Sequence, residues 1–262
     1  MDKLKDRATY NAKYLEYEEF AEKILSYTSV PYQIEIQPGR EKGKALCWMS
    51  CPYCYGGSAQ NSGDRLSAER YIQIIKEVSS GPNGRIEKLI LAGYATDPLN
   101  YEYFDDLYEC SLNHNFITGI HTKLLKISKK FLNLVSQKNV RDESYISISI
   151  DAGFKESYNI THGITSSVDI LKKIYKNIRD IQDIKNKVID INTTYLLTVH
   201  NCSLEEISKS IEDLQSLEVD TLRFSFPQVP RKYDYKQKTN IFIENRSELI
   251  KEIKNLIKKK TK

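Results

Sequence analysis

The sequence predicts an α/β fold in which parallel strands and helices alternate to form a partial, open (β/α)6 TIM-like barrel. From residue 43 onward, short apolar runs alternate six times with longer helical patterns, and such repeats favour a parallel sheet with right-handed crossovers. Four of the later runs alternate apolar and polar residues, whereas a parallel strand buried on both faces is apolar throughout. One polar face indicates a curved sheet around a solvated cavity, and six strands are too few for a closed eight-stranded barrel.

Three segments are expected along the chain. Residues 1–42 form a short N-terminal extension with an amphipathic helical pattern at 12–27 and an alternating strand pattern at 32–37. Residues 43–230 form the barrel core, and residues 231–262 form a C-terminal helical segment. Strands are predicted at 44–48, 87–93, 116–123, 145–151, 188–198 and 220–226. Helices are predicted at 67–79, 100–113, 128–138, 166–181, 203–217 and 246–260.

The polar strand faces predict where the chemistry lies. In "YISISID", Ser147, Ser149 and Asp151 share the face opposite three isoleucines. The neighbouring strands offer His121 and Lys123, Asn192 and Thr194, and Arg223 and Ser225. Chemistry on such a barrel lies at the carboxyl ends of the strands and in the loops that follow. His121 and Lys123 are candidate substrate contacts, although an exposed strand end also explains them.

Composition narrows the class of protein. The chain has 262 residues and a net charge of +4, with no basic aromatic stripe, so a nucleic-acid partner is not expected. The first residues lack the apolar core of a signal peptide, and no apolar run approaches the ~18 residues of a membrane span. We therefore expect a cytoplasmic protein that does not enter a membrane. Five cysteines, an odd number, argue against a closed disulfide framework.

Three of these cysteines lie in the loop "CWMSCPYCYGG", at positions 47, 51 and 54. Three thiolates can hold a [4Fe–4S] cluster and leave one iron without a protein ligand, whereas electron-transfer clusters take four cysteines. A zinc site completed by Cys110, Cys202 or a histidine is the alternative. Structural zinc sites draw their ligands from two paired knuckles, and the second knuckle is missing.

The spacing C-x3-C-x2-C, with Tyr53 directly before the third cysteine, resembles the signature of the radical S-adenosylmethionine (SAM) enzymes. The resemblance implies that Cys47, Cys51 and Cys54 bind a [4Fe–4S] cluster, that SAM binds its fourth iron, and that Tyr53 lies near the adenine. It also implies reductive cleavage of SAM to a 5′-deoxyadenosyl radical, which takes a hydrogen atom from the substrate.

Four further segments resemble this family. "LILAGYATDPL" stands where the family has a Gly-Gly-Glu-Pro-like segment, although Asp97 can equally be a turn or helix-cap residue. "SISIDAGFKESYNITHG" resembles radical enzymes that act on peptides and natural products, and "INTTYLLTVHNCSLEEI" and "DTLRFSFPQVP" resemble the next two strands. The resemblance implies that the following residues bind SAM: Gly93, Thr96, Asp97, Ser149, Asp151, Asn192, Arg223 and Ser225.

The expected function is hydrogen-atom abstraction from a peptide or small natural product, in a redox-neutral reaction such as epimerisation, elimination or rearrangement. No further cysteines follow residue 230 for an auxiliary cluster, and an external donor such as flavodoxin or ferredoxin would supply the electron. The alternatives are an activase that installs a glycyl radical on a partner protein and a non-catalytic iron–sulfur redox protein.

Overall fold

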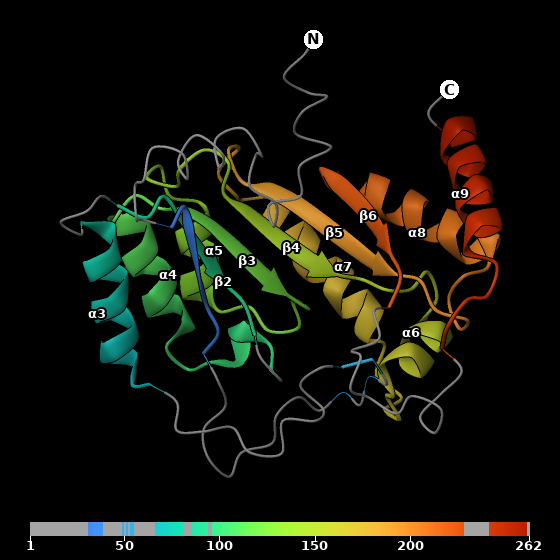
Figure 1. Ribbon diagram of the computed structural model, residues 1–262, viewed down its shortest axis with the longest axis horizontal. Coiled ribbons are helices and arrows are strands. Elements are labelled where there is room, and N and C mark those ends of the chain that lie inside the picture. The colour runs from blue at the N-terminus through green and yellow to red at the C-terminus, as the bar shows by residue number, and fades with distance from the viewer. Residues whose placement is uncertain are drawn as a thin grey trace.

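A computed structural model of the chain describes residues 31–38, 49, 51, 53–54, 66–80, 85–93, 96–227 and 241–260. Six parallel strands form one sheet in the order β1-β2-β3-β4-β5-β6. The sheet is open, with β1 and β6 at its edges, and Figure 1 shows it fanned across the molecule with α5, α7 and α8 behind the strands. The predicted partial TIM-like barrel with parallel strands is confirmed.

The strands fall where the apolar runs predict them, with one difference at the N-terminal edge. Residues 32–37, expected in an extension outside the core, contain β1, which pairs with β2 as the edge strand of the sheet. The predicted strand at 44–48 and the predicted helix at 12–27 lie outside the described residues. The strands are β1 (Gln33–Ile36), β2 (Lys88–Leu91), β3 (Ile117–Thr122), β4 (Tyr145–Ser149), β5 (Asp190–Leu196) and β6 (Thr221–Ser225).

Several helices begin at a residue whose side chain caps the first turn. The Ser67 hydroxyl accepts from the amide of Arg70, and the Asp169 carboxylate of "SSVD" accepts from the amide of Lys172. Two elements were not predicted: the short 3-10 helix η2 (Pro98–Asn100) and the helix α6 (Lys155–His162). The other helices are α3 (Ala68–Ser79), α4 (Phe104–Asn113), α5 (Lys129–Val135), α7 (Ile170–Gln182), α8 (Leu204–Ser216) and α9 (Arg246–Lys260).

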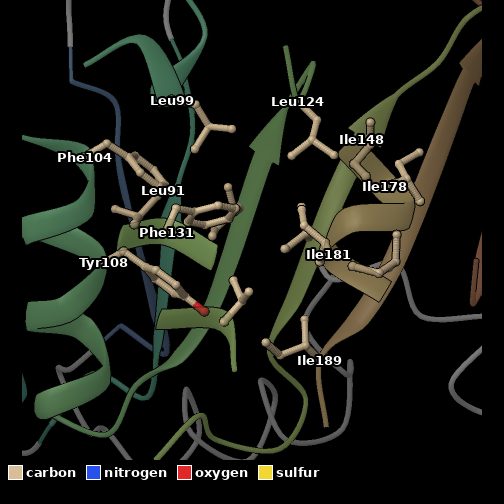
Figure 2. Packing of buried hydrophobic residues seen from close by; sticks show 14 of the residues in the cluster. Leu91, Leu99, Phe104, Tyr108, Leu124, Phe131, Ile148, Ile178, Ile181 and Ile189 are labelled. Carbon is tan, nitrogen blue, oxygen red and sulfur yellow. The ribbon is translucent and has the colours of Figure 1, made fainter. Parts of the chain in front are cut away.

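The main core lies between the sheet and its helices. Figure 2 shows Phe104 and Tyr108 of α4 beside Phe131 of α5, and Ile178 and Ile181 of α7 beside β4. All five side chains are at most 2% exposed. Burial of this apolar surface is the main force that holds the helices on the sheet.

A second core lies at the β5–β6 edge. Tyr195 and Leu197 pack there with Ile207 of α8 and with Leu249 and Ile253 of α9, so the C-terminal helix belongs to the folded unit (Figure 1).

Among the described helices, none combines the length and apolar character that a membrane span requires.

The opposite face of the sheet carries a different arrangement near its amino-terminal end. Tyr145 is 2% exposed and clusters with Ile90 and Ala92. A β-carbon on Gly119, its register partner in β3, would lie 2.3 Å from the Tyr145 ring. Gly119 therefore leaves the space in which this ring lies across β3.

Candidate functional site

The cysteine loop meets the carboxyl ends of the strands. Cys51 is partly buried and Cys54 is exposed, and the amide of Cys54 donates to the carbonyl of Cys51 in a tight turn. Neither forms a disulfide within the described part of the chain. Cys47, the first predicted ligand, lies outside the described residues. The turn presents two of the three expected thiols at the end of the sheet where the site was predicted.

A buried histidine joins this loop to α6. His162 is the last residue of α6 and is 0% exposed. Its Nδ1 lies 3.1 Å from Cys51 Sγ and 3.0 Å from the Tyr53 hydroxyl. Burial, reinforced by the nearby Lys123 charge, holds the pKa of His162 well below its ordinary value, so the imidazole is neutral.

Asp151 lies at the centre of the polar contacts. Its Oδ2 accepts from Lys123 Nζ at 2.7 Å and from the Tyr53 hydroxyl at 3.4 Å, and it lies 3.6 Å from His162 Nε2. Burial and the charge of Asp151 raise the pKa of Tyr53 well above its ordinary value. Tyr53 therefore stays protonated and donates its hydrogen bond.

The backbone around Asp151 is held from β5 and from the loop after it. Asp151 has a φ of 53°, a left-handed conformation that is uncommon outside glycine. Its Oδ1 accepts from the amide of Leu196, and its carbonyl accepts from Asn201 Nδ2 at 2.8 Å. Asn201 is 0% exposed, and its Oδ1 accepts in turn from the amide and hydroxyl of Thr198. This network fixes where the Asp151 carboxylate lies.

A second buried residue anchors α6. The Glu206 carboxylate of α8 accepts from the amide of Gly153 at 3.0 Å and from the Ser157 hydroxyl. A β-carbon on Gly153 would lie 2.3 Å from the carbonyl oxygen of Glu206, so a larger residue does not fit. A carboxylate at the start of a helix is favourable because the helix dipole places partial positive charge there. At the other end, Gly163 ends α6 in a left-handed conformation.

The predicted polar strand residues lie side by side on the sheet. Register pairs His121 with Ser147, and Ser147 with Asn192. The next row toward the carboxyl ends joins Ser149, Thr194 and Arg223, and the row beyond it joins Leu196 to Ser225. These side chains are partly exposed apart from Ser147, which is buried.

Arg223 is the main positive charge among the three rows. Among the described atoms its Nε is buried without a hydrogen-bond partner. Burial raises the pKa of Tyr145, and the nearby charge of Arg223 partly opposes this rise. A buried guanidinium N–H without an acceptor is unfavourable, so this site suits an anionic or carbonyl-bearing ligand.

The segment after β2 is built around Asp97. Asp97 caps η2 through the amide of Leu99 and also accepts from the hydroxyl of Thr122 and the amide of Lys123. The cap role left open by the sequence is thus observed, whereas a SAM contact stays a prediction. A β-carbon on Gly93 would lie 1.7 Å from the carbonyl oxygen of Thr96, so a larger residue does not fit at this position.

The two predicted substrate residues each bind a protein partner. His121 Nε2 lies 2.8 Å from the Tyr145 hydroxyl, and Lys123 pairs with Asp151. Lys123 therefore lies in the Asp151 network, and His121 lies two residues nearer the amino-terminal end of the sheet. Their role toward a substrate stays a prediction.

Three residues of the site were missed by the sequence analysis. His162, Asn201 and Glu206 all lie within the segments "SISIDAGFKESYNITHG" and "INTTYLLTVHNCSLEEI", but only the strand residues of those segments were nominated. The signal that could have found them is that each is a polar side chain within a segment that resembles the family.

A family model described as the Radical SAM superfamily matches residues 45–214, well over half of the 262-residue chain. The chain belongs to the radical SAM superfamily. Membership implies SAM and an iron–sulfur cluster as cofactors. The described thiols of Cys51 and Cys54 suit the cluster because thiolate sulfur is the usual protein ligand of iron–sulfur centres.

Solved structures of radical SAM proteins share the fold. Streptococcus suis SuiB bound to S-adenosylmethionine is 14% identical, with a TM-score of 0.66 and coverage of 93% of this chain and 52% of SuiB. SuiB bound to its precursor peptide SuiA is 13% identical, with a TM-score of 0.67 and coverage of 93% and 50%. The protein anSMEcpe with bound AdoMet is 20% identical, with a TM-score of 0.56 and coverage of 78% and 55%.

These likenesses show a shared fold. The chain spans about half the length of the SuiB structures. A comparison with curated protein sequences finds no match.

Proposed function

We propose that this radical SAM enzyme binds one [4Fe–4S] cluster through Cys47, Cys51 and Cys54 and abstracts a hydrogen atom from a peptide. The observation that carries the proposal is the contact between the cysteine loop and the strand ends, where Cys51 and Tyr53 reach His162 and Asp151. When bound, the cluster and SAM together supply the 5′-deoxyadenosyl radical. The electron comes from an external donor such as flavodoxin or ferredoxin.

The protein residues bind and orient the cofactor. The row of Ser149, Thr194 and Arg223 offers hydroxyl and guanidinium donors to the ribose and carboxylate of SAM. Lys123 neutralises Asp151, so a polar cofactor meets no uncompensated buried charge. The closed network around Asp151 holds these groups in place before the cofactor arrives, which limits the reorganisation that binding requires.

The first experiment tests the cofactors. Anaerobic reconstitution is expected to give iron and sulfide in the ratio of a [4Fe–4S] cluster, and added reductant is expected to yield 5′-deoxyadenosine. Alanine at Cys47, Cys51 or Cys54 abolishes both, whereas alanine at Cys110 or Cys202 leaves both unchanged. Zinc without iron would contradict the cluster, and an intact cluster that never cleaves SAM would favour the redox-protein alternative.

A peptide substrate is supported by the "SISIDAGFKESYNITHG" resemblance and by SuiB, a structural neighbour solved with a precursor peptide. The test uses the reconstituted enzyme with peptide and small-molecule fractions of cells grown in deuterated medium. Deuterium in 5′-deoxyadenosine is expected with the peptide fraction. Deuterium transfer only with the small-molecule fraction would show that the substrate is a small natural product and not a peptide. Deuterium transfer only with an intact glycyl-radical partner protein would favour the activase.

A further inference from the structure

We propose that His162 is a positioning residue that donates a hydrogen bond from Nδ1 to the Cys51 thiolate and raises the reduction potential of the cluster. The inference rests on the proposed cluster at Cys47, Cys51 and Cys54. Its basis is the 3.1 Å distance between His162 Nδ1 and Cys51 Sγ, two residues that lie 111 positions apart in the sequence. Hydrogen bonds to cluster sulfurs are among the factors that set reduction potentials.

The direction of the hydrogen bond follows from the state of the cysteine. A metal-bound cysteine is a thiolate, which only accepts hydrogen bonds. If the imidazole carried its proton on Nε2, the lone pair of Nδ1 would face the thiolate at 3.1 Å, which is repulsive. Nε2 lies 3.6 Å from Asp151 Oδ2, beyond hydrogen-bond distance, and no other atom of the described residues accepts from it, so within this part of the chain that repulsion is not offset. The cluster-bound protein therefore carries the imidazole proton on Nδ1.

Tyr53 is the competing neighbour of Nδ1, at 3.0 Å. Its hydroxyl also reaches Asp151 Oδ2 at 3.4 Å, and a carboxylate is a stronger acceptor than an imidazole nitrogen. Tyr53 thus donates to Asp151, and the Nδ1 proton is directed to the thiolate, the charged acceptor.

The surroundings strengthen this hydrogen bond. His162 has no exposed surface, so no solvent dipoles reorient to screen the interaction, and hydrogen bonds in low-dielectric surroundings are electrostatically stronger. The helix that carries His162 is held at its start by Glu206. A fixed donor stabilises the reduced cluster, which carries one more negative charge, more than the oxidised cluster. The potential therefore rises.

The test compares two variants of matched shape in the reconstituted full chain. Asparagine places an N–H near the position of Nδ1, whereas leucine has the same branching and no donor. We expect His162→Leu to lower the ratio of reduced to oxidised cluster about tenfold at a fixed potential, which is 59 mV for a one-electron couple. His162→Asn is expected to stay close to the wild type. Potentiometric titration followed by electron paramagnetic resonance, without SAM, gives both values.

His114 supplies the control because it is a histidine beside Cys110, a cysteine outside the loop. His114→Leu is expected to leave the potential unchanged. Equal potentials for His162→Leu and the wild type, or loss of the cluster in both His162 variants, would overturn the inference while the proposed function stands. A wild-type chain that assembles no cluster would overturn the proposed function and the inference together.

Discussion

At the scale of single residues, Gly119 shows how one missing side chain shapes the face of the sheet that bears the polar rows. Tyr145 occupies the volume that a β-carbon on Gly119 would need, and its hydroxyl meets His121. The sequence analysis expected polar residues on this face but did not foresee a buried tyrosine there. The alternation of apolar and polar residues indicates on which face of the sheet a side chain lies. The direction in which a large side chain such as tyrosine points depends on the space that its neighbours leave.

We expect Gly119→Ala to lower the free energy of unfolding by about 1–3 kcal/mol, the usual cost of overpacking. The new methyl group would lie 2.3 Å from the Tyr145 ring. In a Tyr145→Leu background the same substitution is expected to cost much less, because the ring is absent. Urea unfolding of the four proteins gives this double-mutant cycle, and strictly additive costs would show that the ring is not the obstacle.

The buried carboxyl group of Asp97 predicts that the free energy of unfolding depends on pH. Burial raises the pKa of its carboxyl above the ordinary value near 3.8, against the opposing hydrogen bonds from Lys123, Thr122 and Leu99. The folded state thus binds this proton more tightly than the unfolded state, and the associated stability is lost as pH rises from 3.8 through the raised pKa.

The measurement is the difference in unfolding free energy between the wild type and Asp97→Asn, which does not titrate. We expect the wild type to lose stability relative to the variant as pH rises through this window. A pH-independent difference would mean that the carboxyl titrates equally in both states.

At the scale of elements, the strands and long helices follow the hydrophobic pattern, and α6 does not. Its eight residues, KESYNITH, are mostly polar, so periodicity gives little signal. Gly163 ends α6 locally, but the other contacts that fix α6 are tertiary: the Glu206 carboxylate at its start, and the contact of His162 with Cys51, more than a hundred positions upstream. For the same reason Asp151 was predicted from strand alternation, but its histidine neighbour was not.

Glu206→Ala is expected to lower the free energy of unfolding by about 1–3 kcal/mol, since it leaves the buried Gly153 amide without its acceptor and removes one of the two acceptors near the Ser157 hydroxyl. Glu206→Gln keeps one carbonyl oxygen and is expected to cost less. Chemical denaturation of the cluster-free protein measures both. Equal costs for the two variants would show that the carbonyl oxygen of glutamine does not replace the carboxylate as the acceptor.

At the scale of the whole molecule, the predicted partial barrel is observed as an open sheet whose β5–β6 edge is completed by α9 (Figure 1). The sequence analysis placed α9 in a C-terminal segment beyond the core, because composition does not reveal what a lysine-rich helix packs against. Its buried side chains, Leu249 and Ile253, share the second core with β5 and α8.

Two isoleucines of α9 provide a matched pair. Ile253 is 5% exposed, and Ile250 is 38% exposed. Ile253→Ala is expected to lower the free energy of unfolding by about 2–5 kcal/mol through the cavity it leaves, and Ile250→Ala by less than about 1 kcal/mol. Thermal and urea unfolding test this, and equal small effects would mean that α9 does not stabilise the sheet edge.

The left-handed backbone of Asp151 restricts which residues evolution can place there. Glycine would adopt the conformation with ease but would lose the acceptors for Leu196 and Lys123. Asparagine tolerates the conformation and keeps one acceptor, but it leaves the Lys123 ammonium without a countercharge. Aspartate alone satisfies the backbone angle, the amide and the ammonium together. Variation at this position in related chains is therefore expected to be accompanied by a change at position 123.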